Sequence, residues 1–96
     1  MANQIDNSGW HGFLHLCTKN KNIEHFDEFF GLFMTLEERD DFAKRYLIVK
    51  ELLLEQKTQR EIAKDSGVSI AKITRGSNSL KTSSESLQNF IKKNLS

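Results

Sequence analysis

Residues 58–81, TQREIAKDSGVSIAKITRGSNSLK, decide the fold of this chain. The segment opens with Thr58 and Glu61 at the spacing of a capping box, in which two side chains satisfy backbone N–H groups that a helix start leaves unpaired. Gly67 can adopt the positive φ of a tight turn, and Ser69 can cap the helix that follows. The segment therefore predicts a helix, a tight turn and a second helix.

The small and apolar side chains of this segment suit one particular kind of helix pair. Ala63 allows the two helices to cross closely, and Val68 and Ile73 fill the wedge between them. This is the geometry of a helix-turn-helix, which presents its second helix to the major groove of DNA. From the pattern alone, two ordinary packed helices remain the alternative.

The charges of the chain are divided between its two halves. Its 96 residues include 14 Lys or Arg and 13 Asp or Glu, for a formal net charge of +1. Residues 1–56 hold 6 basic and 10 acidic residues, a net −4, whereas residues 57–96 hold 8 and 3, a net +5. A basic half is typical of a surface that meets a polyanion. Charge alone is also compatible with a solvated face.

Length and composition restrict the chain to one all-helical domain. With 38% apolar and 28% charged content, 96 residues are too few for two independent cores, which excludes a multidomain enzyme. The sequence has no proline and five glycines, and no segment alternates apolar and polar residues for long. These features remove most signals for turns and edge strands. We expect a single all-α domain over residues 1–96.

Apolar residues recur at helical spacing on both sides of the decisive segment. Three helices are predicted from them: one on Trp10, Phe13, Leu14 and Cys17, one on Ile23, Phe26, Phe29, Phe30 and Phe33, and one on Leu87, Phe90, Ile91 and Leu95. Capping boxes mark two helix starts. Thr35 with Glu38 begins a helix that runs to about Leu54, and Thr82 with Glu85 precedes the last helix. The chain is therefore predicted to contain six helices.

The helix that begins after Thr35 carries more apolar surface than one chain of this size can cover. Its apolar residues point to more than one side: Phe42, Tyr46, Leu47, Ile48, Val49, Leu52 and Leu53. We expect a homodimer in which the N-terminal helices of one chain cover this helix of the other. A bundle formed by one chain around this helix is the alternative.

The stretch from Ile73 to Lys81, ITRGSNSLK, resembles the Trp repressor family, as do Leu36-Glu-Glu-Arg39 and Arg45 upstream. The resemblance extends from about Leu32 to Lys81, and the residues outside that range match only in their helical pattern. It implies an intertwined homodimer that binds L-tryptophan as a corepressor, needs no further cofactor, and represses a palindromic operator DNA controlling tryptophan-related genes.

The resemblance also divides the chain by role. It implies that residues 1–56 and 82–96 form the dimerisation core and that residues 58–81 form the DNA-reading head. A ligand bound between core and head could then control how the head is held.

The implied tryptophan site is centred on two arginines. Arg45 and Arg75 match the pair that sandwiches the indole ring, where each stacked guanidinium adds about 0.5 to 2 kcal/mol. Arg75 also matches the partner of the ligand's carboxylate, a task that suits a planar guanidinium. Thr35 matches a threonine near that carboxylate, and Ser79 matches a hydroxyl near the ammonium.

Backbone groups and a glycine complete the implied site. The carbonyls around Leu32 and Met34 are expected to come from the partner chain. Gly76 lies inside a predicted helix, where glycine costs about 1 kcal/mol relative to alanine, so it marks a helix end or a place of close approach. In the family, a glycine at this position lies against the ligand ring.

The resemblance implies DNA contacts as well. Arg60 matches a direct guanine contact, the commonest specific pairing between a side chain and a base. Gln59 and Lys64 are expected at phosphates, which position a protein without specifying sequence. Four further contacts lie at the exposed start of the reading helix: Ile70, Ala71, Lys72 and Thr74.

Two residues depart from the family pattern. Lys72 stands where better-known members have threonine, so it places a long cation near both the ligand and the DNA groove, where it could contact a phosphate or guanine or change the water network. Ser66 stands at an inward position where leucine is usual. We predict that Ser66→Leu raises the thermal unfolding midpoint, because a leucine would pack the head more tightly.

Other chemistry has little support in the sequence. His11 and His15 lie one turn apart with Cys17 and His25 nearby, but a convincing fourth ligand is missing, so we expect no metal site and no catalysis. A single cysteine forms no internal disulfide. The first basic residue is Lys19 and no long apolar stretch is present, so we expect a cytoplasmic location.

Two rival functions remain from the residues alone. A ligand-independent helix-turn-helix protein would use Arg75 for a phosphate instead of a carboxylate. A protein-binding helical adaptor would share the fold but not bind DNA, and shallow salt dependence would favour it.

Overall fold

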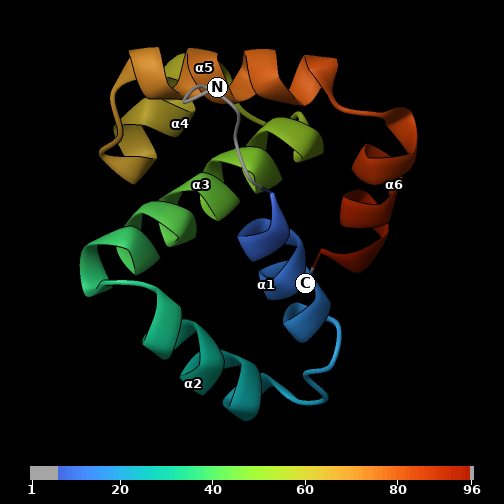
Figure 1. Cartoon of the computed structure of the whole chain (residues 1–96). Helices are drawn as coiled ribbons and strands as arrows, with labels where there is room; N and C mark the ends of the chain where they lie inside the picture. Colours follow the sequence, from blue (N-terminus) through green and yellow to red (C-terminus); the bar gives the residue numbers. More distant parts are fainter. Residues whose placement is uncertain (1–6, 96) are drawn as a thin grey trace, which may run out of the picture. The chain divides into compact units, whose positions relative to one another are not determined.

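The computed structural model describes residues 7–95, which form six α-helices and no strand (Figure 1). The helices are α1 (Ser8–Cys17), α2 (Ile23–Phe33), α3 (Leu36–Leu54), α4 (Gln59–Ser66), α5 (Ile70–Thr82) and α6 (Glu85–Asn94). The prediction of an all-α chain is confirmed. The chain divides into two compact units, Met1–Leu36 and Glu37–Ser96. Residues 1–6 and 96 of the predicted domain lie outside the described residues.

The first unit contains α1 and α2, which are joined by aromatic rings. Phe13 of α1 stacks on Phe29 of α2 with ring centroids 5.5 Å apart, and it meets Phe33 edge-on at 5.3 Å. Each such pair is worth about 0.5 to 1.5 kcal/mol beyond its buried area. No residue of either helix is buried, so the two helices do not cover each other's apolar surface.

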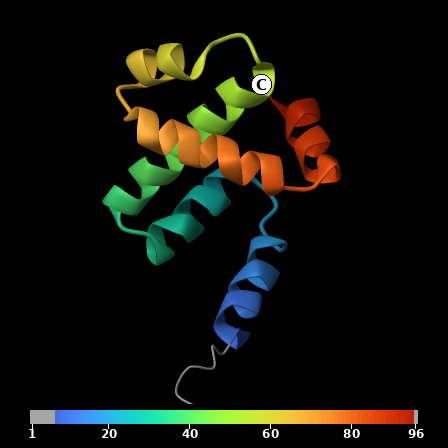
Figure 2. The ribbon, with the colours of Figure 1, turned by 90° about the horizontal axis from the view of Figure 1, so that it is seen from above.

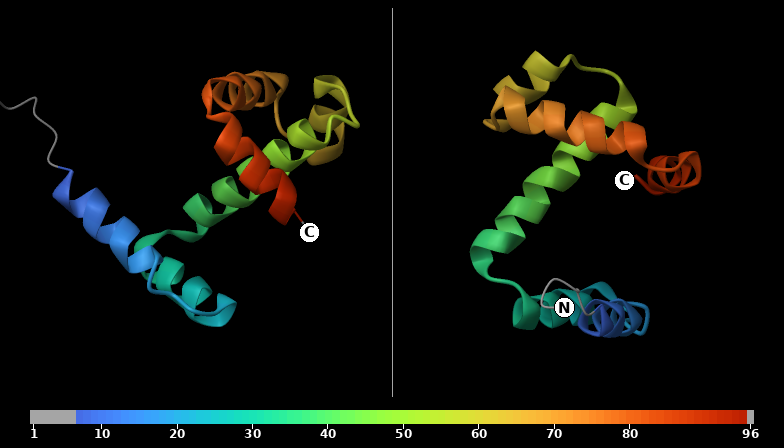
Figure 3. Two further views of the ribbon diagram at one scale, coloured as in Figure 1. Left: turned by 90° about the vertical axis from the view of Figure 1, so that its right-hand side faces the viewer. Right: turned by 45° about the horizontal axis from the view of Figure 1, so that its top comes forward.

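The second unit is built on one apolar core beneath the helix-turn-helix. Ile48 of α3, Ile62 of α4 and Ile73 of α5 are buried together, and Ile73 is 0% exposed. Val68, in the turn, closes the core. Figure 3 shows α4 and α5 against each other at one end of α3. The head therefore shares its core with the central helix.

Gly76 allows α5 to cross closely over α3 (Figure 2). A Cβ atom at this glycine would lie 3.2 Å from Cγ2 of Ile48 and 3.9 Å from Cδ1 of Leu52. The sequence allowed two roles for Gly76, a helix end or a place of close approach. Gly76 lies well inside α5, so the first prediction is wrong and the second is confirmed. The side chains that occupy the space beside Gly76, Ile48 and Leu52, both belong to α3.

The local signals of the helix-turn-helix are confirmed. The Thr58 hydroxyl accepts from the Glu61 N–H at 3.1 Å, and the Glu61 carboxylate accepts from the Thr58 N–H at 2.9 Å. Gly67 ends α4 in the left-handed region with φ +71°. The Ser69 hydroxyl accepts from the Lys72 N–H at 3.3 Å and caps α5. The turn is therefore fixed at both sides by its own residues.

The predicted capping box at Thr82 and Glu85 is wrong. Thr82 is the last residue of α5, and its hydroxyl donates to the Ser79 carbonyl at 2.9 Å. Ser84 caps α6 instead, by accepting from the Leu87 N–H at 3.1 Å. Because α5 runs one residue further than the pattern indicated, Ser84, the third of three consecutive hydroxyl residues, takes the cap.

Ser66 has a partner that the sequence does not reveal. Its hydroxyl accepts a hydrogen bond from the Val68 N–H at 3.2 Å, and the residue is half-buried. A leucine here would lose this bond, which is worth about 1 kcal/mol. A leucine would also add apolar surface worth about 1.5 to 3 kcal/mol if it were fully buried.

We therefore expect Ser66→Leu to raise the unfolding midpoint by less than its apolar surface alone would give. Ser66→Ala should lower the midpoint, because it loses the bond to Val68 without adding that surface. Thermal unfolding followed by circular dichroism measures both. A midpoint for Ser66→Leu at or below that of Ser66→Ala would contradict the expected packing gain.

Candidate ligand groove and nucleic-acid interface

A groove of about 570 Å³ lies in the second unit, lined by residues of α3, α5, α6 and the turn before α5. Pockets for small molecules usually measure about 300 to 1,000 Å³, so the groove has the size of a ligand site. Its apolar walls include Ile48 and Val49 of α3, Leu80 of α5, and Leu87 and Ile91 of α6. A flat apolar group could therefore be held between these helices.

Four of the seven predicted ligand residues line this groove: Arg45, Arg75, Gly76 and Ser79. Arg45 comes from α3 and the other three from α5, so the groove joins the central helix to the reading helix. The other three, Leu32, Met34 and Thr35, belong to the first unit and are not among the lining residues. Their part in binding stays a prediction.

The groove carries an excess of positive charge. Lys44, Arg45, Lys72 and Arg75 line it, against one carboxylate, Asp41. Guanidinium groups bind carboxylates and also stack on aromatic faces. A groove with apolar walls and several cations suits an aromatic molecule that carries an acid group. Lys72 thus contributes to the groove from the first turn of the reading helix, as its sequence position indicated.

Gly76→Ala tests whether the space at this glycine is needed for ligand binding. The added Cβ would meet Ile48, which both packs in the core and lines the groove. We expect weaker ligand binding in a calorimetric titration with L-tryptophan. Gly12→Ala is the control, because a Cβ at Gly12 would meet nothing within 4 Å. Normal binding by Gly76→Ala would remove this glycine from the site.

The outer face of the helix-turn-helix presents the predicted DNA contacts. Ile70 is 45% exposed, and Arg60, Lys64, Ala71, Lys72 and Thr74 are also exposed. Gln59, the first residue of α4, is half-buried. These residues are thus accessible on the surface, and their contact with DNA stays a prediction.

A hydrogen bond between α4 and α5 was not predicted from the sequence. The Thr74 hydroxyl donates to Oε1 of Gln59 at 3.0 Å. The two residues are 15 positions apart, and each was predicted as a separate DNA contact. No local pattern signals this bond, because it exists only once the two helices have packed.

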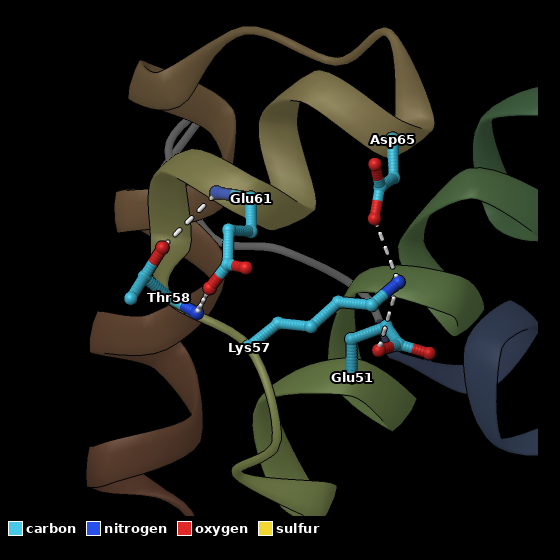
Figure 4. Close-up of polar contacts among 5 residues, drawn as sticks. All are labelled: Glu51, Lys57, Thr58, Glu61 and Asp65. Atoms are coloured by element: carbon cyan, nitrogen blue, oxygen red, sulfur yellow. Dashed lines mark hydrogen bonds and ion pairs between the residues drawn. The ribbon is translucent and has the colours of Figure 1, made fainter.

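An ion pair ties the start of the helix-turn-helix to α3 (Figure 4). Nζ of Lys57 lies 2.8 Å from Oδ2 of Asp65 on α4 and 3.6 Å from Oε2 of Glu51 on α3. The hydrogen bond to Asp65 raises the pKa of Lys57, and the same bond lowers the pKa of Asp65. Hydrogen bonds from Thr58 lower the pKa of Glu61.

These carboxylates predict weaker folding in acid. Because the pKa of Asp65 is depressed below the ordinary 3.8 and that of Glu61 below 4.5, their stabilisation is present above these values and is lost as the pH falls through the folded-state pKa. The raised pKa of Lys57 gives stabilisation that is lost only at alkaline pH, above its ordinary 10.5. The effects are small because the groups are exposed.

Asp65→Asn should therefore lower the unfolding midpoint slightly near neutral pH and have less effect below about pH 4. Thermal unfolding across this range measures the difference. Asp40→Asn, at an exposed aspartate of α3, controls for the change in net charge. An equal effect of Asp65→Asn at both pH values would contradict the role of the ion pair.

Residues 7–95 offer neither a metal site nor a membrane-spanning helix. Within that range, no group of three or more His, Cys, Asp or Glu residues could hold a metal ion. The same residues include no helix long and apolar enough to span a membrane.

Known proteins resemble this chain over nearly its whole length. Residues 8–95 match the family described as Trp repressor protein. The chain is 53% identical over 92 residues to the Trp operon repressor homolog of Chlamydia caviae, covering 96% of this chain and 91% of that protein. It is 47% identical over 95 residues to the homolog of Chlamydia trachomatis serovar L2, covering 99% and 100%. The homolog of Vibrio parahaemolyticus is 33% identical over 92 residues, covering 96% and 89%.

Proposed function

The chain belongs to the Trp repressor family, which consists of transcription regulators and not enzymes, and on that premise we propose that it is a tryptophan-activated repressor. It binds L-tryptophan as its corepressor, needs no other cofactor, and then binds a palindromic operator that controls tryptophan-related genes. Such a protein acts on DNA in the bacterial cytoplasm.

The groove between α3 and α5 is the observation that carries this proposal. Its apolar walls fit the indole, and Arg45 and Arg75 supply guanidinium groups for the ring and the carboxylate. Ser79, which also lines the groove, is proposed to bring its hydroxyl near the ammonium. Thr35 is proposed near the ligand's carboxylate, and the carbonyls around Leu32 and Met34 would come from the partner chain of the proposed dimer.

The position of the groove explains how a ligand could control DNA binding. The ligand would touch α3 through Arg45 and α5 through Arg75 and Gly76, so it would fix the reading helix relative to the central helix. The two reading helices of a dimer must lie about 34 Å apart to enter successive major grooves, a spacing already established for the Trp repressor family. Without the ligand, the heads would sample other spacings and bind DNA more weakly.

A homodimer is part of the proposal, because one chain leaves much apolar surface uncovered. Phe42 and Tyr46 of α3 are 57% and 48% exposed, and Phe90 of α6 is 63% exposed. In α2, Ile23 is 83% exposed. Residues 1–56 and 82–96 would form the dimer core. A folded monomer at low micromolar concentration in analytical ultracentrifugation would contradict it.

The reading head, residues 58–81, would supply the DNA contacts. Arg60 is proposed for guanine, with Gln59 and Lys64 at phosphates. The exposed start of α5 would enter the groove: Ile70, Ala71, Lys72 and Thr74.

Calorimetric titration with L-tryptophan, with other amino acids as controls, tests the corepressor. We expect saturable binding near one ligand per chain. Operator DNA should tighten tryptophan binding by the same factor by which tryptophan tightens DNA binding. No heat at several temperatures would reject the corepressor and leave a ligand-independent DNA-binding protein as the alternative.

The salt dependence of DNA binding tests the basic head. If about six to eight phosphates are neutralised per dimer, log K against log salt should have a slope of about −5 to −7. A slope near zero would reject the head as the DNA surface and favour a protein-binding adaptor.

A further inference from the structure

The bond between Thr74 and Gln59 limits what Thr74 can recognise. A threonine hydroxyl has one proton to donate and two lone pairs that accept. In this structure the proton is given to Oε1 of Gln59 at 3.0 Å. The oxygen that remains available at the surface can therefore only accept a hydrogen bond.

We propose that Thr74 is a specificity-determining residue that selects a base presenting an exocyclic amino group in the major groove, adenine or cytosine, on the strand it faces. This inference rests on the proposed operator binding. In the major groove, adenine presents the N6 amino group and cytosine the N4 amino group as donors, whereas guanine and thymine present oxygen acceptors. A hydroxyl that can only accept pairs with the first two and repels the others.

The same bond assigns a complementary task to Gln59. Because its Oε1 accepts from Thr74, its amide nitrogen keeps both protons for another partner. Phosphate oxygens only accept hydrogen bonds, so they suit this amide nitrogen and do not suit Thr74. This one hydrogen bond thus suits Gln59 to a phosphate of the DNA backbone and Thr74 to the edge of a base.

The placement of Thr74 supports contact with a base. Thr74 is exposed and lies one helical turn after Ile70, which is 45% exposed, while the adjacent Ile73 is fully buried. Ile70 and Thr74 therefore share the outer face of α5. This face is the one that a helix-turn-helix presents to the major groove.

The test measures base preference with the full-length protein and saturating L-tryptophan. The preferred duplex is first selected from a randomised DNA library, and its single-base-pair variants are then compared for wild type, Thr74→Val and Thr74→Ser. We expect one position in each half-site where an amino-bearing base is preferred by about five- to tenfold. Thr74→Ser should keep that preference, and Thr74→Val should reduce it to less than about twofold.

Gln59→Met provides a second, independent variant. It removes the acceptor for the Thr74 proton and the phosphate donor together, so overall affinity should fall while the hydroxyl becomes free to donate. The preference at the same position should then weaken, because guanine and thymine become acceptable partners. Circular dichroism establishes that each variant is folded.

The outcomes separate this proposal from the function on which it rests. A Thr74→Val variant that keeps the wild-type preference overturns the role of Thr74, as does a Thr74-dependent position that prefers guanine or thymine. Absence of sequence-selective binding by the folded wild type overturns the proposed operator binding, and the Thr74 assignment falls with it.

Discussion

Replacing Ile73 with alanine is expected to lower the free energy of unfolding by about 2 to 5 kcal/mol, because it opens a cavity at the centre of the core. Ile73 is 0% exposed and packs with Ile48, Ile62 and Val68. The four side chains come from α3, α4, α5 and the turn, so the substitution weakens the packing of the head against the central helix.

Urea unfolding followed by circular dichroism measures this loss. Ile70→Ala is the matched control, since it makes the same change three residues earlier in α5 at a side chain that is 45% exposed. Ile73→Val should cost only about 0.5 to 1.5 kcal/mol. An Ile73→Ala variant as stable as the Ile70→Ala variant would show that the core is not centred on Ile73.

Arg45→Ala is expected to weaken the ligand dependence of DNA binding and to leave ligand-free DNA binding unchanged. Arg45 lines the groove from α3, so its loss removes the ligand's cationic contact with the central helix. A stacked guanidinium contributes about 0.5 to 2 kcal/mol, which corresponds to a loss of roughly two- to thirtyfold in tryptophan affinity.

The measurement is DNA binding with and without tryptophan, at a ligand concentration that only just saturates the wild type. Arg39→Ala is the control, because Arg39 lies on the same helix and does not line the groove. If Arg45→Ala kept the full tryptophan effect, the ligand would have to act without this arginine. If ligand-free DNA binding also failed, Arg45 would have a structural role.

Much of the local structure of the head could be predicted because its causes lie within a few residues. The capping box of Thr58 and Glu61, the left-handed Gly67 and the Ser69 cap each depend on one turn of backbone. The same reasoning failed at Thr82, because three consecutive hydroxyl residues, Thr82, Ser83 and Ser84, are candidates for one helix cap. A difference of a single residue in the length of α5 decided between them.

Contacts between distant residues could not be predicted from local patterns. The space that Gly76 provides is occupied by Ile48, which lies 28 positions earlier. The Gln59 to Thr74 bond and the Lys57 ion pair also form only after helices pack. Of the predicted ligand residues, those on α3 and α5 line one groove because these helices share a core.

Ile48 has three neighbours at once: the buried core, Gly76 on the reading helix and the ligand groove. A substitution of Ile48 would change the stability of the fold, the packing of α5 on α3 and the wall of the groove together. Few other residues should therefore be tolerated at this position. Changes of effector among descendants of this protein should instead accumulate at exposed groove residues that are not proposed DNA contacts, such as Asp41 and Lys44. A repressor can in this way come to respond to a different ligand while its fold and its DNA contacts stay unchanged.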